Sequence, residues 1–75
     1  MFNRKTLSSC RVGDWGDIAE LDTFDRTILG KLMSLGIVPG TSVRVLRTHP
    51  GFLLQAGHTK VALDRRLAAY IVLEK

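Results

Sequence analysis

The clearest pattern of apolar and polar positions lies between residues 24 and 35, where it predicts a helix. Apolar side chains recur there at the three- and four-residue spacings that place them on one helical face. The stripe and its edges comprise Phe24, Ile28, Leu29, Leu32, Met33 and Leu35. Asp22 or Thr23 is expected to cap the N-terminus, and Asp25 to lie in the first turn, where a carboxylate suits the helix dipole.

The residues after this stripe predict a sharp end to the helix and a turn into a strand. Gly36 stands where a helix C′ residue belongs, because glycine takes positive φ without a Cβ penalty. Ile37 can then fold back onto the last helical turn, as in a Schellman motif. Pro39 and Gly40 suit the two central positions of a type II turn over residues 38–41.

The rest of the chain consists of short alternating runs that predict strands. The expected strands cover residues 16–22, 41–47, 52–56, 60–63 and 70–73, with residues 10–13 as a possible short first strand and a bulge or strand end near Leu21. Residues 14–17, 49–51 and 57–58 are expected to form turns. Asp64 can cap a single helical turn over residues 64–69. We therefore predict a mainly β chain, a small SH3-like barrel of about five strands with one inserted helix at about residues 24–35.

The composition is that of one small globular domain. The chain has 75 residues, of which 45% are hydrophobic and 24% charged, so residues 1–75 are expected to form a single domain with residues 1–6 loose. No apolar run approaches the roughly 20 residues of a membrane span. The N-terminus does not resemble a secretory signal, and Cys10, the one cysteine, has no partner for a disulfide. A cytoplasmic location is expected.

The net charge of +4 is concentrated in the second half of the chain. Residues 1–39 hold equal numbers of basic and acidic side chains. Residues 40–75 hold Arg44, Arg47, Lys60, Arg65, Arg66 and Lys75 against only Asp64 and Glu74. A basic face attracts nucleic acid, anionic lipid or an acidic protein, whereas the simpler interpretation is solubility alone.

Motifs for catalysis or metal binding are not apparent. The chain has no nucleophile motif and no phosphate-binding loop, and its carboxylates have turn and capping roles available, so no enzymatic activity is expected. His49, His58 and Cys10 are weak candidates for metal ligands, and they fall short of the four ligands of a closed zinc site. We expect no metal and no cofactor.

Nucleic-acid binding by small barrels usually combines basic residues with stacking aromatic side chains. The aromatic candidates are Trp15, Phe52 and Tyr70. None of them is interleaved in sequence with the arginines of the second half, and most aromatic residues of so small a core are expected to be buried. Nucleic acid is therefore an unlikely partner on the sequence alone.

The segment Leu-Met-Ser-Leu-Gly-Ile-Val-Pro-Gly at residues 32–40 resembles the signature of the FeoA family, small cytosolic accessory proteins of bacterial ferrous-iron uptake. Residues 61–72 resemble the closing strands of that family, and Gly13, Gly16 and Ile18 its opening strands. The resemblance implies an SH3-like barrel with an inserted helix. It also implies a partner, the membrane transporter FeoB with its cytosolic guanine-nucleotide-binding domain. One departure is a shorter hairpin after His49-Pro50, which puts any partner contact made by that loop in doubt.

Three hypotheses follow. The first is a non-enzymatic accessory or regulatory protein that docks on the cytosolic part of a FeoB-type transporter, has no small-molecule substrate and meets the membrane only through that transporter. The others are a nucleic-acid-binding small barrel and a small metal-binding carrier. The expected contact residues for the first are Met33, Arg44, Arg47, Arg65 and Arg66, while Leu32, Leu35, Gly36, Pro39 and Gly40 form the structural motif. Self-association is left open.

Overall fold

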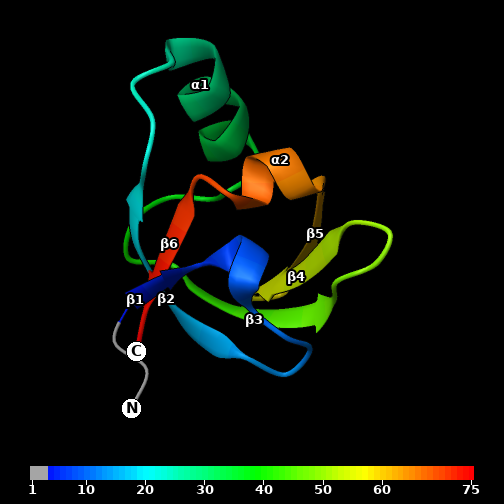
Figure 1. The fold of residues 1–75 in the computed structure, drawn as a ribbon. Helices are drawn as coiled ribbons and strands as arrows, with labels where there is room; N and C mark the ends of the chain where they lie inside the picture. The colour runs from blue at the N-terminus through cyan, green and yellow to red at the C-terminus, as the bar shows by residue number, and fades with distance from the viewer. Residues whose placement is uncertain (1–3) are drawn as a thin grey trace.

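The computed structural model describes residues 4–75 and contains one antiparallel sheet with helices inserted between its strands (Figure 1). The elements in chain order are β1 (Arg4–Thr6), the 3-10 turn η1 (Leu7–Ser9), β2 (Trp15–Leu21), α1 (Arg26–Ser34), β3 (Ser42–Arg47), β4 (Phe52–Ala56), β5 (Thr59–Leu63), α2 (Arg65–Ala68) and β6 (Ile71–Glu74). The strand order in the sheet is β1-β6-β2-β3-β4-β5. The mainly β class is confirmed, and the described part has six strands where about five were predicted.

The N-terminal region differs most from the prediction. Residues 4–6 were expected to be loose, but they form β1 on the outer edge of β6, with Arg4 opposite Glu74. The Arg4 guanidinium holds this edge by donating to the carboxylates of Glu20 at 3.0 Å and Glu74 at 3.4 Å. Residues 1–3, the rest of the segment predicted to be loose, lie outside the described residues.

The strand predicted at residues 10–13 is absent, and so is the turn predicted at 14–17. Cys10 follows η1 and is buried, and Gly13 turns the chain with a φ of 95°. The Gly13 N–H donates to the Val45 carbonyl, and the Val45 N–H donates to the Asp14 carbonyl. Because these hydrogen bonds hold the chain beside β3, strand β2 begins at Trp15.

Helix α1 begins later than predicted. Its N-cap is Asp25, whose carboxylate accepts hydrogen bonds from the N–H groups of Thr27 at 2.9 Å and Ile28 at 3.3 Å, so Asp22 and Thr23 are not the cap. Phe24 therefore precedes the helix and is fully exposed. Leu32 is the one residue of α1 that is buried, and the helix projects from one end of the sheet (Figure 1).

The helix ends as predicted, in a Schellman motif. Gly36 has a φ of 86°, its N–H donates to the Met33 carbonyl at 3.0 Å, and the Ile37 N–H donates to the Leu32 carbonyl at 3.0 Å. Ile37 is completely buried. The motif thus returns the chain from the helix into the core.

The predicted type II turn follows directly. The Thr41 N–H donates to the Val38 carbonyl at 3.2 Å, and Gly40 has a φ of 94°. The single helical turn after β5 is also confirmed as α2, since the Asp64 carboxylate accepts from the Leu67 N–H at 2.7 Å. The predicted irregularity in β2 is a register shift against β6 between Ile18 and Glu20.

The core lies within the curled sheet and is entirely apolar among the described residues. It contains Leu7, Cys10, Ile18, Leu32, Ile37, Val43, Val45, Phe52, Leu54, Val61, Leu63, Ala68, Ile71 and Leu73. Alternate residues of β3, Val43 and Val45, point inward while Arg44 points outward. No helix in residues 4–75 is both long and apolar enough to cross a membrane.

Candidate functional site: a groove between the two helices

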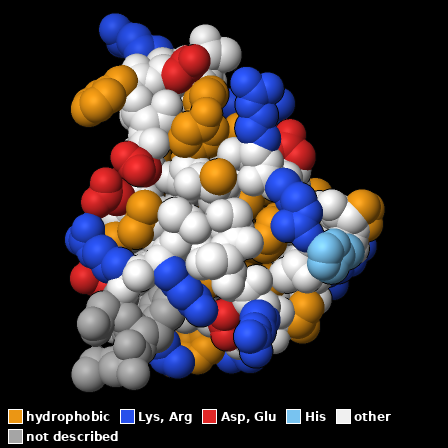
Figure 2. All heavy atoms as spheres, in the orientation of Figure 1, with side chains coloured by type: hydrophobic (Ala, Val, Ile, Leu, Met, Phe, Trp, Pro, Cys, Tyr) orange, Lys and Arg blue, Asp and Glu red, His pale blue; other side chains and the backbone are white. Residues whose placement is uncertain are grey.

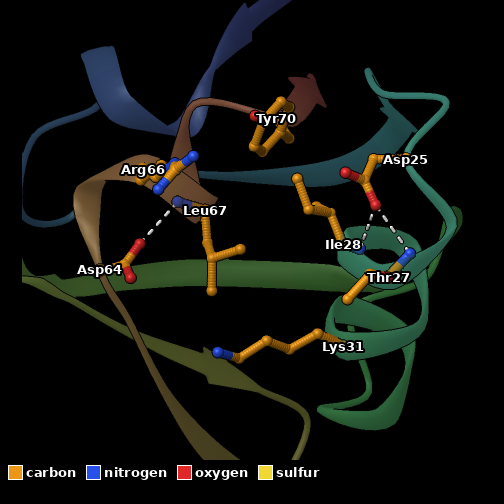
Figure 3. Close-up of a pocket in the computed structure, with 8 residues that line it drawn as sticks. All are labelled: Asp25, Thr27, Ile28, Lys31, Asp64, Arg66, Leu67 and Tyr70. Atoms are coloured by element: carbon orange, nitrogen blue, oxygen red, sulfur yellow. Dashed lines mark hydrogen bonds between the residues drawn. The ribbon is translucent and has the colours of Figure 1, made fainter.

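A groove of about 320 Å³ separates α1 from α2 (Figure 3). Its lining residues are Asp25, Thr27, Ile28, Lys31, Asp64, Arg66, Leu67 and Tyr70. Ile28 from α1 and Leu67 from α2 point toward each other across it, with Tyr70 on one side and Lys31 on the other (Figure 3). Ile28, Leu67 and Tyr70 are half-buried and pack against the core, so they form an apolar floor to the groove.

The charged groups around this floor differ in how they are engaged. Asp25 and Asp64 are the N-caps of the two helices, and their carboxylates accept backbone N–H groups. The side chains of Lys31 and Arg66, by contrast, make no hydrogen bond or ion pair with any other residue of the described chain. The groove therefore offers an apolar floor with two available cations, which suits an apolar side chain accompanied by an acidic group.

Large apolar side chains are also exposed on and beside α1. Phe24 is 101% exposed, Met33 55% and Leu35 37%. Figure 2 shows hydrophobic side chains on the part of the surface that α1 forms, with basic side chains near them. We call these three residues together with the groove the α1 surface. Large exposed apolar side chains gathered on one element and its flanks favour an interaction site.

The basic residues predicted as contacts are not all part of the α1 surface. Arg66 lines the groove, whereas Arg44 lines a second hollow beside Trp15. Arg47 is exposed at the end of β3.

Arg65 has a local structural role. Its guanidinium donates to the Thr48 carbonyl at 3.0 Å and to His49 Nδ1 at 2.9 Å, and it lies 5.4 Å from the centre of the Phe52 ring. These contacts tie α2 to the turn between β3 and β4. Arg65 is therefore less available to a partner than Arg66.

Sequence reasoning missed most of the groove. The apolar stripe includes Phe24, which the structure leaves exposed beside the groove, and nothing in the sequence pattern singles out Lys31. Tyr70 was considered only as an aromatic candidate for nucleic-acid binding, and Leu67 was given no place in a site. The available signal was an aspartate at each helix start, Asp25 in a first turn and Asp64 as a cap. These residues place two helix N-termini, but they do not show that the two helices face each other.

The candidate metal ligands are not gathered into one site. His49 contacts Arg65, His58 lies in the turn between β4 and β5, and Cys10 is buried with its Sγ 3.6 Å from the Thr6 carbonyl. Burial raises the pKa of the Cys10 thiol, and the Lys5 charge opposes this only in part. Within residues 4–75 no three His, Cys, Asp or Glu side chains are grouped so as to hold a metal ion.

The curled antiparallel sheet, the inserted helix and the short α2 turn define a small SH3-like β domain. The family model for the FeoA domain matches residues 5–75, and the chain belongs to the FeoA family. This family is linked to ferrous-iron transport. The comparison with curated protein sequences gives no match.

Solved structures with the same fold include two FeoA proteins. One is the crystal structure of an iron uptake regulatory protein (FeoA), with 26% identity, a TM-score of 0.87, and coverage of 95% of this chain and 96% of that one. Another is the zinc complex of FeoA from Stenotrophomonas maltophilia, a procaryotic SH3 domain protein, with 28% identity, a TM-score of 0.78, and coverage of 93% and 89%.

The fold also occurs as part of a longer protein. A manganese-dependent transcriptional repressor matches with 27% identity and a TM-score of 0.88, over 100% of this chain and 43% of the repressor. This chain therefore spans less than half the length of that repressor.

Proposed function

We propose that this chain is a non-enzymatic accessory protein of bacterial ferrous-iron uptake, acting in the cytoplasm as a single domain of residues 1–75. It docks on the cytosolic part of a FeoB-type transporter and modulates uptake. Membership of the FeoA family supports the link to iron transport. The observation that carries the docking role is the α1 surface, an apolar groove with available cations beside exposed apolar side chains.

The energetics of this surface favour a binding role. Transferring a fully exposed side chain such as Phe24 into an interface contributes about 1.5–3 kcal/mol. A domain of this size can offer about 800 Å² to one partner, which is the usual area for specific association. Lys31 and Arg66 at the groove then favour a partner segment that carries acidic side chains, and they speed the encounter with it.

The two carboxylates of the groove and the neighbouring Arg65 have structural rather than catalytic tasks. Asp25 and Asp64 cap helices, and Arg65 is held by Thr48 and His49. A general acid or base requires a positioned group within reach of a reacting atom, and these carboxylates are already engaged with backbone N–H groups. This supports a binding module rather than an enzyme.

The test is co-purification with the full-length transporter in mild detergent at low and high salt. The wild-type chain is expected to be retained, and Phe24→Ser together with the double variant Lys31→Glu, Arg66→Glu is expected to reduce retention. Lys60→Glu, a charge change on β5, is the matched control and should leave retention unchanged. The double variant Arg44→Glu, Arg65→Glu tests two of the three remaining predicted basic contacts.

The outcomes separate the function from the surface. No association at either salt, together with normal ferrous-iron uptake in a deletion strain, would refute the proposal. If association survives the Phe24, Lys31 and Arg66 substitutions, the chain docks on the transporter, but the α1 surface is not the contact. If only the Arg44 and Arg65 substitutions abolish retention, the contact lies on β3 and on the Arg65 side of α2 instead.

A further inference from the structure

A row of four side chains crosses the outer face of the sheet from β2 to β5. Trp15 lies opposite Arg44, Arg44 opposite Gln55, and Gln55 opposite Lys60. Their neighbours on these strands, such as Gly16, Val43, Leu54 and Val61, are buried, so the four side chains share the outward face. We call them the cross-strand row.

The row combines an exposed aromatic ring with cations. Trp15 is 47% exposed, and the Lys75 ammonium lies 4.6 Å from the centre of its ring. Trp15, Arg44 and Gln55 line a shared hollow of about 200 Å³. Neither the Arg44 nor the Lys60 side chain has a hydrogen bond or ion pair within the described chain.

Acidic side chains near the row do not neutralise it. Asp17, the next outward residue on β2, accepts a hydrogen bond from the Ser42 hydroxyl and keeps its negative charge, but the cations Arg44, Lys60 and Lys75 outnumber it. Glu74 is paired with Arg4. The Gln55 amide N–H donates to the Gly57 carbonyl at 2.7 Å, which holds this side chain in place and leaves its oxygen as an acceptor. The row is thus net positive with one aromatic face.

We propose that the cross-strand row binds single-stranded nucleic acid. A base would stack on the indole of Trp15, displacing the Lys75 ammonium toward a phosphate, while Arg44 and Lys60 meet further phosphates. Neighbouring strands are about 4.8 Å apart, so the row spans roughly 14 Å. That length corresponds to about four stacked nucleotides at about 3.4 Å each, the lower limit of site sizes on small β platforms.

This inference revises the sequence-based view that aromatic and basic residues are not interleaved. Trp15 and Arg44 are distant in sequence, and the β2–β3 register makes them direct neighbours. An exposed ring among cations favours nucleic acid over an acidic peptide. Every base has a face that can stack on the indole, whereas the carboxylates of a peptide would interact only with the cations and leave the ring unused. The row shares no residue with the groove, but Arg44 is also a predicted docking contact, so the groove variants are the ones that separate this activity from docking on a transporter.

The experiment uses the single tryptophan as a reporter. Trp15 is the one tryptophan of the chain, so quenching of its emission reports the row directly. The full chain is titrated with a fluorescein-labelled oligothymidylate of about a dozen nucleotides at about 50 mM salt, and anisotropy is recorded in parallel. We expect saturable quenching and an affinity that falls steeply with salt.

The variants separate stacking from charge. Trp15→Leu should weaken binding about tenfold by anisotropy, while Trp15→Phe, which keeps a ring, should retain most of it. Arg44→Gln and Lys60→Gln should each lower the slope of log affinity against log salt by about 1. The control is the double variant Lys31→Gln, Arg66→Gln at the groove, which removes two positive charges where each row variant removes one, and which should still change affinity less than twofold. Circular dichroism confirms that each variant is folded.

Several results would overturn the proposal. One is the absence of saturable binding at low salt. Another is an equal loss in the groove control and the row variants, because net charge alone would then explain the affinity. Equally tight binding of a duplex of the same length, of polyglutamate or of anionic vesicles would remove base stacking and show a general preference for polyanions. Specific binding that Trp15→Leu leaves intact would place the site elsewhere.

Discussion

Replacing Gly36 tests the physical reasoning behind the junction of helix and strand. Gly36 has a φ of 86°, and a Cβ added there would meet no other atom within 4 Å. The cost of Gly36→Val is therefore conformational rather than steric, at least about 1–2 kcal/mol for an L residue held in the left-handed region. If the chain instead leaves that region, completely buried Ile37 is displaced, which costs about 1.5–3 kcal/mol.

The assay is urea denaturation followed by circular dichroism and Trp15 emission. A chain of this length has a free energy of unfolding of about 4–11 kcal/mol. With an m-value near 1 kcal/mol per molar urea, Gly36→Val should lower the midpoint by about 1–2 M.

The matched control is Gly30→Ala inside α1, where an added Cβ also meets no atom within 4 Å. It should raise the midpoint by up to about 1 M, because alanine is about 1 kcal/mol more favourable than glycine in a helix interior. The argument is that an added Cβ destabilises the chain at positive φ and stabilises it inside a helix. An unchanged midpoint for Gly36→Val, or midpoint shifts of the same sign in both variants, would refute it.

Three further predictions concern a cap, a thiol and a metal. Asp25→Ala should lower the free energy of unfolding by about 1 kcal/mol, since two helix N–H groups lose their acceptor; a urea midpoint equal to wild type would contradict this. Because burial raises the pKa of the Cys10 thiol, iodoacetamide should label the native chain slowly at neutral pH and faster only as the pH rises above the ordinary thiol range. Labelling in denaturant should be rapid, and fast labelling of the native chain at neutral pH would refute this prediction. Anaerobic titration should show no tight one-to-one ferrous-iron binding, and tight binding lost in a His49→Ala, His58→Ala variant would overturn that expectation.

The segment from α1 into β3 could be predicted closely because its conformation is set locally. Gly36 and Gly40 are needed at positive φ, and Pro39 fixes the turn between them. Such constraints act over a few residues, so they can be recognised without tertiary information. The same holds for Asp64, which caps α2 with its own side chain.

Elements that depend on distant contacts could not be predicted. The sequence of β1 is polar, and it is a strand because it pairs with β6, with Arg4 and Glu74 at opposite ends of the chain. The start of α1 was misplaced for a related reason. Periodicity included Phe24 in the stripe, but the carboxylate of Asp25 caps the helix one residue later and leaves the phenylalanine in solvent.

The candidate site was mostly hidden for the same reason. Ile28 and Leu67 face each other only because the fold brings α1 beside α2. The cross-strand row likewise depends on the register of four strands, which no local pattern specified. Composition did correctly indicate where basic side chains are numerous, but not which of them would be engaged in ion pairs or backbone contacts.

Helix α1 is attached to the core by one fully buried side chain, Leu32, and one half-buried side chain, Ile28, and this has a consequence for how the chain opens. Freeing α1 exposes these two side chains but leaves the ladders of the sheet intact, so the helix can unfold locally at a lower free energy than the whole domain. Its amide protons should therefore exchange with deuterium before those of β2, β3 and β6. A partner that covers the groove would close this opening route, and protection confined to α1 would reveal its binding even where the structure of the sheet does not change.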